Sequence, residues 1–65
     1  MKYTHLVTYY NKKPMIVDRH NSFSIEEEIE FVIYSLASLY VITIELFLNN
    51  ELIVILNNKC EIIYR

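Results

Sequence analysis

Two Asn-Asn pairs, Asn49-Asn50 and Asn57-Asn58, divide the last part of this sequence into three short apolar runs. Asparagine tolerates the left-handed backbone conformation that tight hairpin turns require, and this chain contains no glycine to adopt it. The runs on either side of each pair are rich in β-branched and large apolar residues, which is typical of strands. The pattern therefore predicts a three-stranded antiparallel meander over Val41–Arg65.

If both pairs form two-residue loops, the register of the meander follows from them. Phe47 would then face Leu52, Leu46 would face Ile53, and Ile55 would face Cys60. Because side chains alternate along a strand, one face of this meander is almost wholly apolar. The other face is mixed, yet it carries more apolar residues than a water-facing surface usually does. We expect those apolar residues to form a protein interface, namely Phe47, Leu52, Val54, Leu56 and Ile63.

Upstream of the meander, the sequence predicts two further strands joined by a turn. Tyr3–Tyr10 is β-branched and aromatic, and Met15–Arg19 is a second, shorter run of the same kind. Pro14 lacks an N–H and cannot donate to a ladder, so the second strand is expected at a sheet edge. Alternation alone leaves open which face of the first strand is buried.

A helix is predicted between the second and third strands. Ser24 and Glu27 have the spacing of a capping box, and acidic residues in the first turn suit the positive end of the helix dipole. The helix is expected to end near Leu39 or Tyr40, with one apolar stripe packed on the meander: Ile25, Ile29, Val32, Ile33, Leu36, Leu39 and Tyr40. Phe31 and Tyr34 would lie on the opposite side, where they form a second candidate protein interface.

These elements predict a single α+β domain over residues 1–65 with the order β-β-α-β-β-β. One helix would pack on one face of a mainly antiparallel sheet of up to five strands. Numbered along the chain, the spatial orders 2-1-3-4-5 and 2-1-5-4-3 both satisfy the strand directions, and the sequence does not choose between them.

The size and composition of the chain favour association with other proteins. A chain of 65 residues buries only about 60% of its unfolded surface, and its one cysteine excludes an internal disulfide, so oligomerisation is the expected support. The apolar stretch from Phe31 to Ile44 is shorter than the ~17 residues of the shortest membrane-spanning helices. We expect a cytoplasmic chain with no membrane span, because no signal peptide is visible and the cysteine usage suits a reducing compartment.

No motif that carries chemistry is present. The possible metal ligands, His5, Asp18, His20 and Cys60, have no zinc-type spacing, and Cys60 is expected to be an inert core residue rather than a nucleophile paired with a histidine. The sequence therefore predicts a protein that is not an enzyme and that uses no cofactor or metal.

The function predicted from these features is protein–protein interaction, with a homodimer formed sheet against sheet and a possible second protein partner. The abundance of Ile, Asn, Lys and Tyr suits a low-GC genome, and such a small domain fits an accessory or inhibitor protein of a phage or mobile element. The net charge of −2 argues against nucleic acid. The alternative is nevertheless a small nucleic-acid-associated regulator that uses a basic and aromatic hairpin: Lys12, Lys13, Tyr9 and Tyr10.

Overall fold

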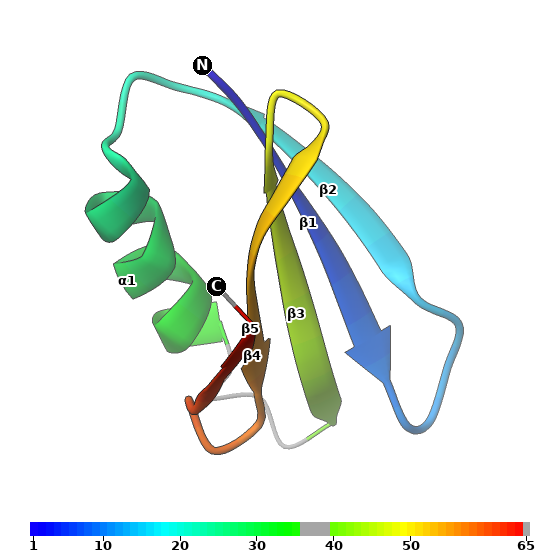
Figure 1. The fold of residues 1–65 in the computed structure, drawn as a ribbon. Helices are drawn as coiled ribbons and strands as arrows, with labels where there is room; N and C mark the ends of the chain where they lie inside the picture. The colour runs from blue at the N-terminus through cyan, green and yellow to red at the C-terminus, as the bar shows by residue number, and fades with distance from the viewer. Residues whose placement is uncertain (36–39, 65) are drawn as a thin grey trace.

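The computed structural model describes residues 1–35 and 40–64 of the chain. Figure 1 shows a sheet with one helix packed against it, and both the fold class and the element order agree with the prediction. The elements are β1 (Lys2–Tyr9), β2 (Met15–His20), α1 (Ile25–Ser35), β3 (Val41–Leu48), β4 (Glu51–Asn57) and β5 (Ile62–Tyr64).

All neighbouring strands of the sheet are antiparallel, and their order in space is β2-β1-β3-β4-β5. This is the first of the two orders that the sequence allowed. The strand β2 lies at one edge, as expected from Pro14, and the short strand β5 lies at the other. In Figure 1 the helix α1 lies on one side of the sheet, and no described element covers the other side.

The helix begins with the predicted capping box. The backbone N–H of Glu27 donates to the Ser24 hydroxyl, and the backbone N–H of Ser24 donates to the Glu27 carboxylate, both at 3.2 Å. The predicted stripe is confirmed at Ile25, Ile29 and Val32, which pack toward the core. Ile33 is exposed instead, and Glu28, which was not predicted on the stripe, is buried. The predicted helix beyond Ser35 falls on residues 36–39, which lie outside the described residues, and on Tyr40. Tyr40 lies in a turn and is exposed, so its predicted place on the buried stripe is wrong.

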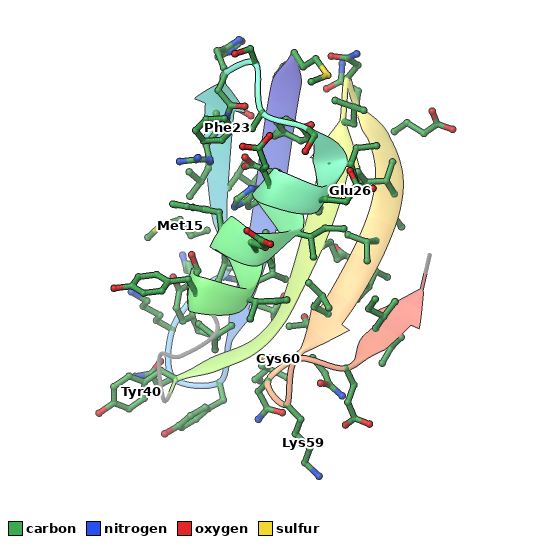
Figure 2. The ribbon with its side chains drawn as sticks, turned by 90° about the vertical axis from the view of Figure 1, so that its left-hand side faces the viewer. Met15, Phe23, Glu26, Tyr40, Lys59 and Cys60 are labelled. Carbon is green, nitrogen blue, oxygen red and sulfur yellow. The ribbon has the colours of Figure 1, made fainter. Side chains whose placement is uncertain are left out.

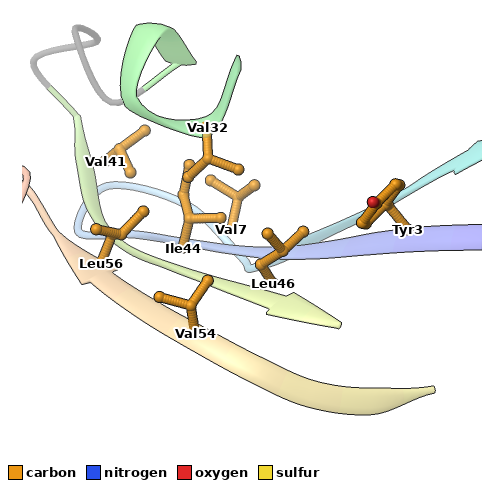
Figure 3. Close-up of a cluster of buried hydrophobic side chains, with 8 residues drawn as sticks. All are labelled: Tyr3, Val7, Val32, Val41, Ile44, Leu46, Val54 and Leu56. Carbon is orange, nitrogen blue, oxygen red and sulfur yellow. The ribbon is translucent and has the colours of Figure 1, made fainter. Parts of the chain in front are cut away.

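The core lies between α1 and the inner face of the sheet, the face that α1 covers. Tyr3 and Val7 from β1 face the helix, which decides the side of the first strand that the sequence left open. The Tyr3 hydroxyl donates to the carbonyl of Phe23 at 2.7 Å and so fixes the linker before the helix. Figure 3 shows the buried apolar side chains: Tyr3, Val7, Val32, Val41, Ile44, Leu46, Val54 and Leu56.

The first Asn-Asn turn is confirmed, but the register that was predicted beyond it is wrong. Asn49 and Asn50 both have positive φ, at 49° and 70°. Phe47 pairs with Leu52 as expected, but a β-bulge then makes Val54 rather than Ile53 the partner of Leu46. One inserted residue moves the following side chains of a strand to the opposite face of the sheet. Because of the bulge, Val54 and Leu56 therefore point into the core.

The second turn is longer than predicted. The backbone N–H of Asn57 donates to the carbonyl of Glu61, so the loop closed by this hydrogen bond holds three residues rather than two. The Asn57 side-chain oxygen accepts from the backbone N–H groups of Lys59 and Glu61, and Cys60 takes the left-handed conformation with φ of 61°. Cys60 is therefore exposed at the turn between β4 and β5 (Figure 2) and is not the core residue that was predicted.

Candidate functional site

The outer face of the sheet, opposite α1, is the main candidate surface. Residues that oppose one another on neighbouring strands point to the same face, so the register defines rows of side chains across the sheet. Thr4 of β1 lies between Asp18 and Phe47, and Phe47 in turn opposes Leu52. A second row runs through Ile16, Leu6, Glu45 and Ile55.

Five apolar side chains lie in these two rows and define the outer apolar face used below: Leu6, Ile16, Phe47, Leu52 and Ile55. All of them retain contact with solvent, and Ile16 is 67% exposed. A shallow hollow of about 270 Å³ opens on this face between β1, β2 and β3, and is lined by Thr4, Leu6, Ile16, Phe47 and Asn50. The surface is therefore apolar and slightly concave rather than uniformly polar.

The predicted interface residues of the meander are distributed over three places. Phe47 and Leu52 lie on the outer apolar face, side by side. Val54 and Leu56 are buried under α1 and cannot take part in a surface contact. Ile63 is exposed on β5, where the register between β4 and β5 shifts.

The two aromatic residues of α1 differ in their surroundings. Tyr34 is 82% exposed and lies on the solvent side of the helix, as predicted. Phe31 is only 39% exposed, because the Arg19 guanidinium stacks on its ring at 3.7 Å and the His5 ring lies at 5.9 Å from it. Phe31 is thus already engaged within the fold, and its side chain joins α1 to β1 and β2.

A polar cluster lies buried between α1, β1 and β2. The Glu28 carboxylate accepts from Arg19 Nε at 2.7 Å and contacts His5 Nε2 at 2.8 Å, both through Oε2. Because a carboxylate only accepts, Nε2 of His5 carries the proton in this contact. The Asn21 amide donates to Oε1 at 3.3 Å. Glu28 and His5 are buried, whereas Arg19 keeps partial contact with solvent.

The cluster keeps Glu28 ionised and His5 neutral. Burial alone would raise the pKa of Glu28, but hydrogen bonds from Arg19 and His5 outweigh it and leave the pKa below its ordinary value. Burial lowers the pKa of His5 in spite of the neighbouring carboxylate. A charged acid, a charged guanidinium and a neutral imidazole thus tie the helix to two strands.

His5 also borders a groove of about 250 Å³ between α1 and the sheet, whose other walls are mainly apolar. A carboxylate that orients a histidine is a general-base arrangement in many enzymes, but it needs a reacting group beside it. Cys60 lies at the β4–β5 turn and does not line this groove, and β1 and β5 are not neighbours. The Cys60–His5 pair considered from the sequence therefore does not form. Within residues 1–35 and 40–64, no group of acidic, histidine or cysteine side chains is arranged to hold a metal ion.

The basic hairpin of the alternative prediction lies at the β1–β2 turn. The Lys12 ammonium stands 4.4 Å from the ring of Tyr9, and the rings of Tyr10 and Tyr40 lie 5.7 Å apart. Lys13 is exposed. The four residues are close together, but Tyr9 is half-buried against the core and has Lys12 over its ring, so little of that ring is open to a stacked base.

Comparison with protein-family models, with curated proteins and with solved structures finds no match for this chain. No helix within the described residues is long and apolar enough to cross a membrane.

Sequence reasoning missed two parts of these surfaces. The contribution of Leu6 and Ile16 to the outer face was missed because the orientation of β1 was left open. The role of Glu28 was missed because three consecutive glutamates were all assigned to the helix dipole. A signal was present, since Glu28 lies at helical spacing from Ile25 and Val32 and so falls on the buried stripe.

Proposed function

We propose that this protein is a non-enzymatic interaction module that associates with itself through the outer apolar face. The observation that carries the proposal is that α1 covers only one side of the sheet, while the other side presents five apolar side chains in two adjoining rows. Antiparallel sheets that face water normally alternate apolar and polar residues, with the polar ones outward. A second layer of protein is the arrangement that such a face fits.

A second copy of the chain suits this face in size and charge. The Cα trace extends over 31 × 21 × 18 Å, so the sheet face is comparable with the ~800 Å² that each partner buries in a standard interface. Glu45 lies in the row between Leu6 and Ile55, and no hydrogen bond or ion pair joins its side chain to another described residue. Lys2 lies on the same face, where its ammonium donates to Asn50 Oδ1 at 3.5 Å, and it would be the counter-charge that a second copy brings to Glu45.

The biological setting is part of the proposal and rests on composition and size. A small self-associating module from a low-GC genome fits an accessory or inhibitor protein of a phage or mobile element. In that role, Tyr34 on the exposed side of α1 is available to a second protein partner.

Phe47→Glu tests the proposed interface. The carboxylate would lie in the centre of the contact without a partner, so the molar mass of the assembly should fall by half. Ile33→Glu is the matched control, since Ile33 is exposed on α1, and it should leave the mass unchanged. Sedimentation equilibrium of both variants measures this, and an unchanged mass for Phe47→Glu would remove the outer face as the interface.

A further inference from the structure

The edge strand β2 presents unpaired backbone groups along its outer side. Met1 and Asn21 exchange both of their backbone hydrogen bonds, at 2.9 and 3.1 Å, in the register that continues along β1 and β2. Hydrogen-bonded and non-hydrogen-bonded pairs alternate in an antiparallel ladder, so Val17 and Arg19 also bond to β1. The N–H and C=O groups of Ile16 and Asp18 therefore point away from the sheet, where no described strand lies.

The side chains along the first half of this edge are those of an interior strand. Met15, Ile16 and Val17 are consecutive, so they are apolar on both faces of the strand. Their side chains are 44%, 67% and 37% exposed. A continuous apolar run is typical of a strand that is covered on both faces, and exposed edges usually carry charge, proline or a bulge. Proline and charge flank this run, with Pro14 directly before β2 and charged residues from Asp18 onward.

We infer that β2 pairs with β2 of a second copy, antiparallel, about a two-fold axis at Ile16. Ile16 would exchange both backbone hydrogen bonds with Ile16 of the second copy, and Met15 would oppose Val17 on either side of the axis. An axis at Asp18 would instead place two carboxylates opposite each other, and an axis at Val17 would place Ile16 against Asp18. With the two-fold axis at Ile16, apolar side chains of one strand oppose apolar side chains of the other.

The ends of the strand agree with this register. Asp18 would oppose Pro14 of the second copy, and its outward N–H would donate to the proline carbonyl. Pro14 has no N–H to return, so the ladder ends there. The pairing would thus span the apolar part of the edge and stop where proline and charge begin.

Edge pairing would enlarge the surface that the proposed function uses. A two-fold axis perpendicular to the sheet places both helices on one side and both outer apolar faces on the other, in one continuous sheet. The inference rests on the proposed self-association for its biological role, but it uses the backbone edge of β2, which shares only Ile16 with the outer apolar face. Met15 and Val17 point to the helix side of β2, so they can be changed without altering the outer apolar face.

Cysteine pairing tests the register directly. In a Cys60→Ser background, which removes the one native thiol, Met15→Cys and Val17→Cys are prepared as two separate chains. A mixture under mild oxidation should give a disulfide between the two kinds of chain, because these positions would be directly opposed. Neither chain alone should cross-link, because two copies of one position would lie more than the ~7 Å between Cα atoms that a disulfide can bridge. Cross-linking of Val17→Cys with itself would overturn the register at Ile16, and the absence of any cross-link would overturn edge pairing.

A mass measurement distinguishes this inference from the proposed function. The double variant Met15→Glu/Val17→Glu would oppose glutamates twice across the axis and should halve the molar mass. The matched control, Ile33→Glu/Tyr34→Glu, places the same charges on the exposed side of α1 and should leave the mass unchanged. If Met15→Glu/Val17→Glu keeps the wild-type mass while Phe47→Glu lowers it, the inferred edge pairing is rejected and the interface at the outer apolar face is supported. The reverse result would reject the outer face and support the edge.

Discussion

His5 and Glu28 are buried together, with Nε2 of the imidazole 2.8 Å from Oε2 of the carboxylate. They lie 23 positions apart in the sequence, on β1 and α1, so the contact fixes the helix to the inner face of the sheet. Arg19 completes the contact from β2 and also stacks on Phe31. This buried polar contact therefore serves to place the helix over its core.

Removing the charge of Glu28 should weaken the fold. Glu28→Gln keeps the shape of the side chain but leaves the donors of Arg19 and His5 competing for one amide oxygen, which should cost about 2–3 kcal/mol in the free energy of unfolding. Glu26→Gln is the matched control, because Glu26 is exposed in the same helical turn. Chemical denaturation of both variants measures the difference, and equal losses would mean that the buried cluster contributes nothing beyond the helix dipole.

The stability of the domain should fall as the pH falls below neutrality. Burial lowers the pKa of folded His5 below its ordinary value of 6.5, so its contribution is present above 6.5 and is lost as the pH falls toward the folded value. The pKa of Glu28 is also lowered, and its contribution is lost at more acidic pH, below 4.5. His5→Gln should flatten the part of this dependence that sets in as the pH falls below 6.5.

His20→Gln is the control for the pH experiment, since His20 is exposed at the end of β2. Thermal unfolding across this pH range should show the wild-type slope for His20→Gln. A slope that disappears in His20→Gln, and persists in His5→Gln, would contradict the assignment to His5.

Phe31 should matter more to stability than Tyr34, although both are aromatic residues of α1. Phe31→Ala removes the ring on which Arg19 stacks and which packs near His5, so it should cost about 1–2 kcal/mol. Tyr34→Ala removes a largely exposed ring and should change stability by less than about 0.5 kcal/mol. Urea unfolding of the two variants decides this, and equal effects would show that the stacking is not stabilising.

Glycine should be better than cysteine at the β4–β5 turn. Cys60 holds a left-handed backbone with φ of 61°, and this conformation costs a residue with a side chain about 1 kcal/mol that glycine avoids. Cys60→Gly should therefore raise the free energy of unfolding by about 1 kcal/mol. Asn58→Gly in the same turn should not, because positive φ is found at Asn49, Asn50 and Cys60 among the described residues and not at Asn58. A gain in Asn58→Gly alone would contradict this view of the turn.

The features that the sequence predicted correctly are those encoded locally. The capping box at Ser24 and the first Asn-Asn turn depend on a few adjacent residues, and both are present in the structure. The bulge beside Phe47 has no such signal in the adjacent residues, and it shifts the register of β3 and β4 directly after the Phe47–Leu52 pair. That single insertion moved Val54 and Leu56 from the predicted interface into the core.

The candidate surfaces were predicted in part for the same reason. Phe47 and Leu52 are adjacent to the turn that sets their register, so their position on the outer face followed from the sequence. The orientation of β1 depends on distant partners, since Tyr3 bonds to the linker and His5 to the helix. Leu6 and Ile16 could be assigned to the outer face only once those partners were known.

The central claim, self-association through the outer apolar face, is tested most directly by the absolute molar mass in solution. Light scattering behind size exclusion should give at least twice the monomer mass of 7.8 kDa for the wild-type chain, decreasing on dilution. Leu52→Lys should shift that decrease to higher concentration, because the ammonium would be buried in the contact. A wild-type mass of one chain at all concentrations would contradict the claim.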